Sequence, residues 1–331
     1  MLFGTMGPII VRIFTDFTIT NTSELLGRSE AELEEHGIRI LFNRSGSADL
    51  ALVLNKVTTP RWVRVPRGNL IKVLQEPLIR NPISHLFTYW HSRAYDQILT
   101  HTPNPIDSRQ IKSLPCTGSF VDPSVISEQP FEQKKEMLSI VASTLTKFPG
   151  HKNRFQFIIR LLKEFPKLES HTFGKGRQRE LQNKIDGLRD YRYSIAIENS
   201  RIPSYITEKY YDCIIAGCVP VYYGAPNIDD YFPANSYISL PIHDFDKCIE
   251  IINELSESDY ESRIPALIEA RSLIREKYSL GAVILNHLAL IQNSPSPRRR
   301  TVFLLRLDGF VCLIQKLGIT TFPKRIISNF R

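Results

Sequence analysis

Short apolar runs alternate with stretches of helical periodicity in the second half of the chain, and this alternation restricts the possible folds more than any other feature. Buried strands separated by helices are typical of a parallel sheet, because each parallel connection must cross back over one face of that sheet. The predicted strands span residues 138–142, 168–173, 193–197 and 219–222. The predicted helices span residues 153–164, 177–188 and 204–216. The pattern therefore predicts a doubly wound α/β domain.

The first part of the chain shows a similar pattern, with turn residues between apolar runs. Its predicted strands span residues 9–14, 38–42, 50–54, 70–74 and 97–100. A stretch rich in Pro, Ser and Thr, residues 101–130, is interpreted as the interdomain region. A chain of 331 residues is long enough for two domains of ordinary size. We therefore expect an α/β protein with two Rossmann-like domains that face a cleft.

Four segments follow from this interpretation. The first domain spans residues 1–125 and the second spans residues 126–265. Residues 266–292 continue a helical pattern that begins at Pro265, and this helix is expected to brace the two domains. Residues 293–331 form a basic amphipathic tail.

The positive charge of the chain is concentrated in this tail. It holds eight Lys or Arg residues and one acid, Asp308, whereas residues 1–292 hold 34 basic and 33 acidic residues. A nucleic-acid enzyme would more often spread positive charge over a working face, so no nucleic-acid partner is predicted.

The remaining composition indicates a soluble cytoplasmic protein. No apolar run reaches the length of a membrane span, and the first residues lack the pattern of a signal peptide. The five cysteines are scattered and are interpreted as reduced thiols.

Polar residues follow the predicted strand 193–197 directly. These are Glu198, Asn199 and Ser200, and in open α/β sheets ligands bind at the carboxyl ends of the strands. The next helix carries Glu208 and Lys209 near its expected start at Ser204. A helix start beside a lysine suits a diphosphate, although ordinary capping by Ser204 with a solvated lysine explains the same residues.

The segment from Ile197 to Pro233 resembles the donor-site signature of the α-1,3/1,4-fucosyltransferases, glycosyltransferase family 10, as found in bacterial-type members. The matching elements are Glu198-Asn199-Ser200, Tyr205-Ile206-Thr207-Glu208-Lys209, Val219-Pro220-Val221, Gly224-Ala225-Pro226-Asn227 and Tyr231-Phe232-Pro233. The match is close over residues 190–245 and weaker in the first domain.

The resemblance implies a GT-B fold and inverting transfer of L-fucose from GDP-fucose to a glycan hydroxyl, in α-1,3 or α-1,4 linkage. It implies no metal and no further cofactor. The implied donor-binding residues are Arg154, Asn199, Tyr205, Glu208 and Lys209. Lys152 and Arg160 remain alternatives to Arg154. Cations and helix amides would stabilise the charge that develops on the leaving GDP.

An inverting transfer also needs a carboxylate that accepts the proton of the acceptor hydroxyl. Glu76, at the end of the predicted strand 70–74, is the expected catalytic base, and Asp16 and Asp96 are weaker candidates. The pair Asp229-Asp230 lies in a predicted turn and is not expected to bind a metal. His85, His91 and His101 lack metal-ligand spacing and are interpreted as ordinary surface or core residues.

Apolar residues of the tail recur at helical spacing, starting with Phe303, Leu304 and Leu307. The tail is therefore expected to lie on an anionic membrane surface, close to an oligosaccharide or lipopolysaccharide-type acceptor. The alternatives are a helix that packs on the protein itself and a partly disordered tail. Such an enzyme would work in the cytoplasm, at the inner face of the membrane. Transfer of another GDP-sugar, and a catalytically silent binding protein of the same fold, are the competing hypotheses.

Overall fold

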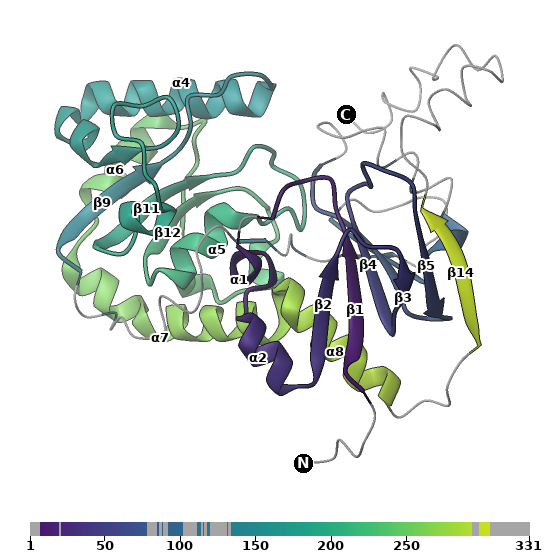
Figure 1. Cartoon of the computed structure of the whole chain (residues 1–331). Helices are drawn as coiled ribbons and strands as arrows, with labels where there is room; N and C mark the ends of the chain where they lie inside the picture. Colours follow the sequence, from purple (N-terminus) through teal and green to yellow (C-terminus); the bar gives the residue numbers. More distant parts are fainter. Residues whose placement is uncertain are drawn as a thin grey trace, which may run out of the picture.

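The computed structural model describes residues 7–19, 21–77, 85, 88, 92–101, 111–113, 115, 118–119, 131, 134–292 and 298–304. These residues form two parallel sheets in two halves that lie side by side (Figure 1). Five strands of the first half have the bounds predicted from the sequence, and the prediction of two α/β halves is confirmed.

The first sheet has six parallel strands in the order β2-β1-β4-β6-β7-β8. They are β1 (Ile9–Phe14), β2 (Ile38–Phe42), β4 (Leu50–Leu54), β6 (Leu70–Leu74), β7 (Gln97–Thr100) and β8 (Ile111–Ser113). Strand β8 lies in the stretch that was interpreted as interdomain, and it pairs with β7 as part of the first sheet. The short helices α1 (Thr22–Leu26) and α2 (Glu30–Glu35) connect β1 to β2.

A small three-stranded sheet covers one face of the first sheet. Its order is β14-β5-β3, from β3 (Gly46–Ser47), β5 (Arg61–Pro66) and β14 (Arg299–Leu304). Strand β5 was not predicted, although Val63 and Val65 are buried while Trp62 and Arg64 are exposed, which is the alternation of a half-buried strand.

The helical prediction for the start of the tail is wrong. Residues Arg299–Leu304 form strand β14, which pairs antiparallel with β5. Pairing satisfies the backbone groups of β14 that face β5, and Leu304 is buried in the core between the two sheets. Residues 305–331 lie outside the described part of the chain.

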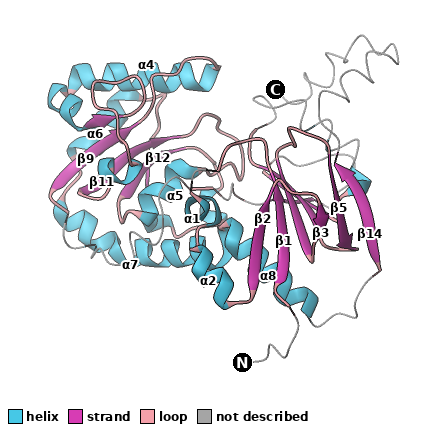
Figure 2. Cartoon of the chain, in the orientation of Figure 1, coloured by secondary structure: helices cyan, strands magenta, loops and turns pink. Residues whose placement is uncertain are grey.

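The second sheet has five parallel strands in the order β10-β9-β11-β12-β13. They are β9 (Glu136–Val141), β10 (Thr172–Phe173), β11 (Tyr191–Ile197), β12 (Val219–Tyr223) and β13 (Ile238–Ser239). Helices α4 (Pro149–Glu164) and α6 (Phe245–Asn253) contact each other through Phe157 and Phe245. They lie on one side of this sheet, and helices α5 (Glu208–Ile215) and α7 (Glu257–Leu273) lie on the other (Figure 2).

Two predicted elements of this half are wrong. Most of the expected strand 168–173 is a 3₁₀ segment, Pro166–His171, and only β10 is extended. The expected helix 177–188 contains only the 3₁₀ turn Lys184–Gly187. Gly174 and Gly176, just before this range, have φ values of 137° and 81°, outside the helical region, and the Arg177 side chain donates to the carbonyl of Ala142.

The helical pattern of residues 265–290 forms two helices joined by a π turn. Helix α7 packs on the second sheet, residues Ile274–Tyr278 form the turn, and α8 (Leu280–Gln292) packs under the first sheet through Leu280, Ile284 and Leu288. The predicted boundary at residues 265/266 falls inside α7.

Three cysteines, Cys213, Cys218 and Cys248, lie in the described residues, and they are buried free thiols. Among the helices formed by those residues, none has both the length and the apolarity to cross a membrane.

Candidate active site

A cavity of about 350 Å³ lies between the two halves of the molecule. Residues from the carboxyl ends of β4, β6 and β11 line it, as expected for a ligand site at the edges of parallel sheets. The cavity brings together five residues that the sequence singled out: Glu76, Asn199, Tyr205, Glu208 and Lys209. The first comes from the first half and the other four come from the second.

A buried carboxylate, Glu198, holds together the two ends of the loop between β11 and α5. Glu198 is 2% exposed, and its two carboxylate oxygens accept hydrogen bonds from the backbone amide (2.7 Å) and the hydroxyl (2.6 Å) of Thr207. Thr207 is also the N-cap of α5. Glu198 was predicted only as one of three polar residues at the end of the strand, without a specific role.

The expected helix cap at Ser204 is wrong. Ser204 has a left-handed backbone with φ of 62°, and Asn227 Oδ1 accepts a hydrogen bond from its amide at 2.7 Å. Helix α5 therefore begins later, at Glu208, and this shift places Glu208 and Lys209 in its first turn at the cavity wall.

Lys209 lies between two carboxylates. Its ammonium nitrogen is 2.7 Å from Glu208 Oε1 and 3.3 Å from Glu198 Oε2, and it donates to Thr207 Oγ1 at 3.0 Å. Burial lowers the pKa of Lys209, but Glu198 and Glu208 outweigh burial and raise it overall. Lys209 is thus a fixed cation.

The pKa values of the two carboxyl groups, Glu208 and Glu198, shift in opposite directions. Burial raises the pKa of Glu208, yet Lys209 and Lys184 bring it down to about 2. Burial dominates for Glu198 and raises its pKa, although Lys209 lowers it. Glu208 therefore stays ionised over a wide pH range, whereas Glu198 takes up a proton more readily than an exposed glutamate does.

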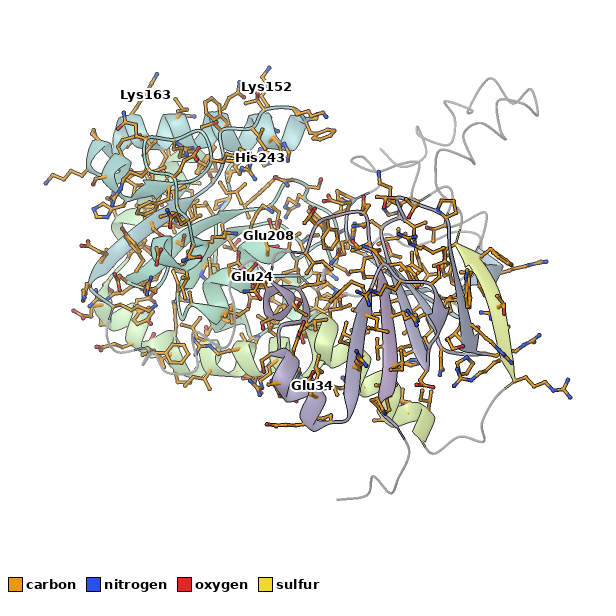
Figure 3. All side chains as sticks on the ribbon, viewed as in Figure 1. Glu24, Glu34, Lys152, Lys163, Glu208 and His243 are labelled. Carbon is orange, nitrogen blue, oxygen red and sulfur yellow. The ribbon has the colours of Figure 1, made fainter. Side chains whose placement is uncertain are left out.

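Arg154 approaches the same loop from α4. Its Nη1 donates to Asn199 Oδ1 at 2.6 Å, and the side chain is 6% exposed. Burial lowers its pKa, while Glu208 and Glu198 raise it. The alternatives point elsewhere, because Lys152 extends from α4 into solvent (Figure 3) and Arg160 stacks on Phe245 at 3.7 Å.

Helix α4 touches the loop directly at Gly150. A Cβ atom on Gly150 would lie 1.7 Å from the backbone oxygen of Asn199. The helix begins at Pro149, and the side chain of its N-cap residue, Phe148, makes no hydrogen bond to the first amides. The close approach explains how Arg154 reaches Asn199.

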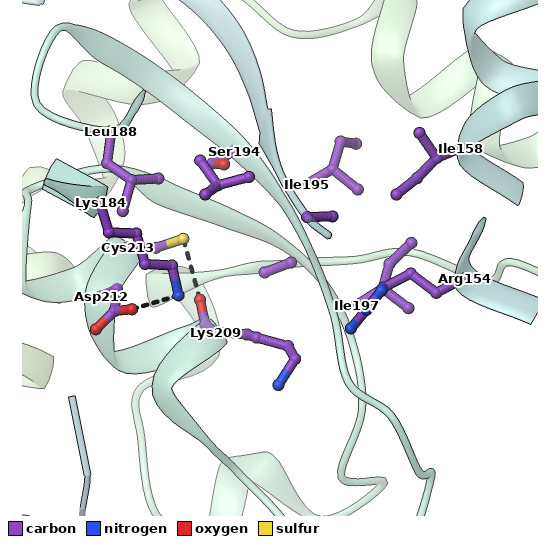
Figure 4. A pocket seen from close by; sticks show the side chains of 13 residues that line it. Arg154, Ile158, Lys184, Leu188, Ser194, Ile195, Ile197, Lys209, Asp212 and Cys213 are labelled. Atoms are coloured by element: carbon purple, nitrogen blue, oxygen red, sulfur yellow. Dashed lines mark hydrogen bonds and ion pairs between the residues drawn. The ribbon is translucent and has the colours of Figure 1, made fainter. Parts of the chain in front are cut away.

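A small pocket of about 20 Å³ adjoins this contact and is lined by three cations, Arg154, Lys184 and Lys209 (Figure 4). Lys184 was not among the predicted site residues. Its ammonium group lies 2.5 Å from Asp212 Oδ2, and Asp212 is fully buried one turn after Glu208. The 3₁₀ turn that carries Lys184 lies next to α5 only in the folded protein. No sequence motif therefore predicted the pair of Lys184 and Asp212.

Glu76 lies on the opposite wall, two residues after β6. The ring of His85 contacts its backbone oxygen at 2.7 Å, and the neighbouring Gln75 amide donates to Asn55 Oδ1 at 2.9 Å. Beneath them the fully buried Lys72 donates to the backbone oxygen of Asn55. Burial lowers the pKa of Lys72 to about 7. Contacts with His85 and Asn55, and the bond from Lys72 to Asn55, thus hold the loop that carries Glu76.

The weaker candidates for the base have structural partners. Asp16 is 3.6 Å from Lys56, and Asp96 accepts from the amide of Leu70 at 3.0 Å and pairs with Arg300 at 2.8 Å. His85 and His101 are buried, while His91 lies outside the described residues. The ring of His101 packs 4.9 Å from the ring of Tyr205, across the two halves.

No cluster of three or more His, Cys, Asp or Glu residues with metal-binding geometry occurs within the described ranges. Asp229 accepts from the Tyr237 hydroxyl at 2.8 Å, and Asp230 accepts from Asn227 at 2.9 Å. Both aspartates therefore have structural partners on the turn that follows β12.

Residues 131–263 match the family model of the glycosyltransferase family 10 (fucosyltransferase) C-terminal region. Over 113 residues the chain is 32% identical to α-(1,3)-fucosyltransferase B of Drosophila melanogaster, which covers 33% of this chain and 25% of that protein. Over 101 residues it is 34% identical to 4-galactosyl-N-acetylglucosaminide 3-α-L-fucosyltransferase 9 of Mus musculus, which covers 29% of this chain and 28% of that protein. The matches therefore span about a quarter of these relatives.

The similarity of fold extends further than the similarity of sequence. An α-glucosyltransferase in complex with UDP superposes with a TM-score of 0.54 at 9% identity, and the match covers 86% of this chain and all of that structure. Together with the two facing parallel sheets, this likeness identifies the fold as GT-B.

Proposed function

We propose that this chain, whose residues 131–263 match the family model of glycosyltransferase family 10, is an inverting fucosyltransferase that uses GDP-fucose and a glycan acceptor. One observation carries the proposal. A single cavity between the two halves holds a carboxylate from one side and the polar residues of the matched region from the other.

The second half would bind the donor. Arg154, Lys209 and the first amides of α4 surround the loop of Asn199, and they would hold the diphosphate. Glu208 keeps its charge and accepts hydrogen bonds, so it suits a ribose or sugar hydroxyl. Tyr205, buried between His101 and the cavity, would contact the donor from the side of the first half.

The first half would bind the acceptor, with Glu76 as the catalytic base. An acceptor hydroxyl oxygen would attack the anomeric carbon of fucose from the face opposite the diphosphate. The bond from that carbon to the phosphate oxygen would break, GDP would leave with the bonding electrons, and Glu76 would take the hydroxyl proton. Arg154 and Lys209 would stabilise the charge on GDP, a role that needs no metal ion or further cofactor.

The direct test is transfer by the purified full chain. Radiolabelled GDP-fucose and GDP-mannose are supplied with a panel of glycans that begins with 4-galactosyl-N-acetylglucosamine, chosen from the name of the mouse relative. We expect GDP release and a fucosylated product with an inverted anomeric centre. Preference for GDP-mannose would identify that nucleotide sugar as the donor. GDP binding without turnover would indicate a catalytically silent homologue.

Two variants assign the roles. Glu76→Gln keeps the shape of the side chain and should lower kcat by about 10²-fold or more, with little change in the KM for GDP-fucose. Glu34→Gln, on the exposed outer side of α2, is the matched control and should behave as wild type. Unchanged kcat in Glu76→Gln would remove Glu76 from the mechanism.

We propose further that the protein works in the cytoplasm at an anionic membrane surface, and that the strand at the start of the tail contributes to contact. Phe303 is 72% exposed and pairs across the strands with Trp62, which is 43% exposed. The exposed Arg64 lies on the same face of β5. Aromatic rings beside a cation suit the interface of an anionic bilayer.

Co-sedimentation of the full chain with phosphatidylcholine vesicles, with and without phosphatidylglycerol, tests this contact. We expect binding to the anionic vesicles only, weakened in Trp62→Ser/Phe303→Ser. Equal binding of the double variant would move the membrane contact elsewhere in the chain.

A further inference from the structure

A second cavity lies at the carboxyl ends of β12 and β13, beside the candidate active site at the end of β11. Its volume is about 370 Å³, within the range of about 300 to 1,000 Å³ typical of ligand pockets. Three tyrosines, Tyr222, Tyr223 and Tyr237, line it together with Arg201 and His243, and we call it the tyrosine pocket. None of these five residues takes part in the transfer proposed above.

The aromatic rings of the tyrosine pocket are held in place by contacts within the protein. The rings of Tyr222 and Tyr237 meet edge to face with centroids 6.1 Å apart, and those of Tyr223 and His243 do so at 5.6 Å. The Tyr223 hydroxyl and His243 Nε2 share a hydrogen bond of 2.9 Å, and the Tyr237 hydroxyl donates to Asp229 at 2.8 Å. Because the rings are already ordered, a ligand that packs on them loses less entropy on binding.

The open side of the tyrosine pocket carries both aromatic surface and hydrogen-bonding groups. His243 is exposed (Figure 3), and Tyr223 and Tyr237 are half-buried. The exposed Arg201 lies close to Tyr223, since burial raises the pKa of the Tyr223 hydroxyl and the charge of Arg201 lowers it. Arg201 and His243 therefore provide polar groups beside partly exposed rings.

A sugar ring matches this combination of groups. The C–H bonds on one face of a hexopyranose are weakly positive and pack on the negative face of an aromatic ring. Its hydroxyl groups point outward from the ring and need donors and acceptors at the edge of that contact. The tyrosine pocket supplies both kinds of contact in one place.

The tyrosine pocket adjoins the candidate active site through residues in contact with each other. The loop after β11 contributes to both, because Asn199 lines the active-site cavity and Arg201 lines the tyrosine pocket. Gly224 lines the pocket as well, and a Cβ there would lie 2.6 Å from Cγ of Glu198, whose carboxylate binds Thr207 at the wall of the active-site cavity. An oligosaccharide in that cavity needs to cross only this loop to reach the tyrosine pocket.

We propose that the tyrosine pocket is a second sugar-binding subsite, which holds a sugar of the glycan acceptor remote from the hydroxyl that reacts. The proposal rests on the function proposed above for the identity of the ligand. A hexopyranose stacks on Tyr223 and His243, and Arg201 donates hydrogen bonds to its hydroxyl groups. One aromatic contact together with one such hydrogen bond increases affinity on the order of tenfold. The protein should therefore prefer an oligosaccharide to a disaccharide.

The kinetic test compares the disaccharide of the glycan panel with the tetrasaccharide and hexasaccharide that repeat it. We expect the wild-type kcat/KM for the longer acceptors to exceed that for the disaccharide by about tenfold. His243→Ala and Tyr223→Ala should each raise the KM for the longer acceptors and remove this advantage. His36→Ala, which changes an exposed histidine at the end of α2, is the matched control and should retain it. Urea unfolding checks that Tyr223→Ala is folded, and His243→Ala decides the question if it is not.

A binding measurement separates this proposal from the proposed function. The three sugars, and GDP in parallel, are titrated by NMR into the full chain and its variants. Tighter binding of the longer sugars that is lost in His243→Ala supports the subsite even if GDP-fucose is never turned over, an outcome that would count only against the proposed function. Equal binding of short and long sugars by wild type, or an advantage that His243→Ala retains, would overturn the proposal. A higher Kd for GDP in either folded variant would assign the pocket to the nucleotide and would overturn it too.

Discussion

The contact between Gly150 and Asn199 gives the sharpest prediction. In Gly150→Ala the new Cβ would lie 1.7 Å from the backbone oxygen of Asn199. An ordinary contact between carbon and a carbonyl oxygen is about 3.3 to 3.6 Å, so α4 and the loop must separate by roughly 1.6 Å or more. Neither partner can relieve the clash by rotating a side chain, because the oxygen belongs to the backbone.

The separation has a cost at the site and a smaller cost in stability. It breaks or stretches the 2.6 Å hydrogen bond from Arg154 to Asn199 and moves both donor-binding groups. Misplacement by about 1 Å costs on the order of 10²-fold in rate, so we expect kcat/KM to fall by at least that factor. Overpacking costs about 1 to 3 kcal/mol, and the better helix propensity of alanine returns up to about 1 kcal/mol. The free energy of unfolding should therefore fall by no more than about 3 kcal/mol.

The assay pairs GDP affinity, measured by calorimetry, with urea unfolding of the same preparations. Lys163→Ala, an exposed change near the other end of the same helix, serves as control and should match wild type in both (Figure 3). If Gly150→Ala binds GDP normally and gains about 1 kcal/mol of stability, as at an open helix position, the packing argument fails.

Three further predictions concern the charged residues around α5. Glu208→Gln should make the free energy of unfolding depend less on pH in the acid range. The pKa of Glu208 in the folded protein, about 2, lies below its value in the unfolded chain, so its charge contributes fully to stability above about pH 4.5 and this contribution is lost as the pH falls towards 2. Urea unfolding of wild type and variant at pH 3 and pH 6 would show the difference. Glu198→Ala should lower the free energy of unfolding by roughly 3 kcal/mol and Glu198→Gln by less, because glutamine retains one acceptor for Thr207; equal unfolding midpoints for the two variants would argue against the Glu198–Thr207 contact. Arg154→Lys should keep the fold but raise the Kd for GDP about tenfold, since a lysine cannot reproduce the planar hydrogen bonds to Asn199 and Ser143, and Lys152→Ala should leave that Kd unchanged.

The sequence predicted the elements whose own residues determine them. The strands of the first half have clear apolar runs between turn residues, and their predicted bounds match the structure. Strand β5 was missed because Pro60 and Pro66 suggested turns, although both tolerate the end of a strand. The helix expected at residues 177–188 is wrong: Gly174 and Gly176, just before this range, have positive φ, and only the 3₁₀ turn Lys184–Gly187 forms within it.

The residues of the candidate site also fall into two groups: those that a local sequence pattern predicts, and those that only the fold brings to the site. Asn199, Tyr205, Glu208 and Lys209 lie within eleven consecutive residues, so a local pattern could reveal them. Lys184 and Glu24 reach the site only through tertiary packing, from a 3₁₀ turn and from a short helix of the other half. No spacing along the chain relates them to α5, which is why sequence reasoning did not find them.

The path of α8 and β14 has a consequence for the order of folding during synthesis. The first sheet buries one face against Leu280, Ile284 and Leu288, and the core on its other face includes Leu304. A ribosome releases these residues long after β1 to β8 have emerged. The nascent first half must therefore wait with apolar surface uncovered, while the second half can complete its own core earlier. Chains stopped near residue 275 should depend on chaperones or aggregate, even though every strand of both parallel sheets has already been made.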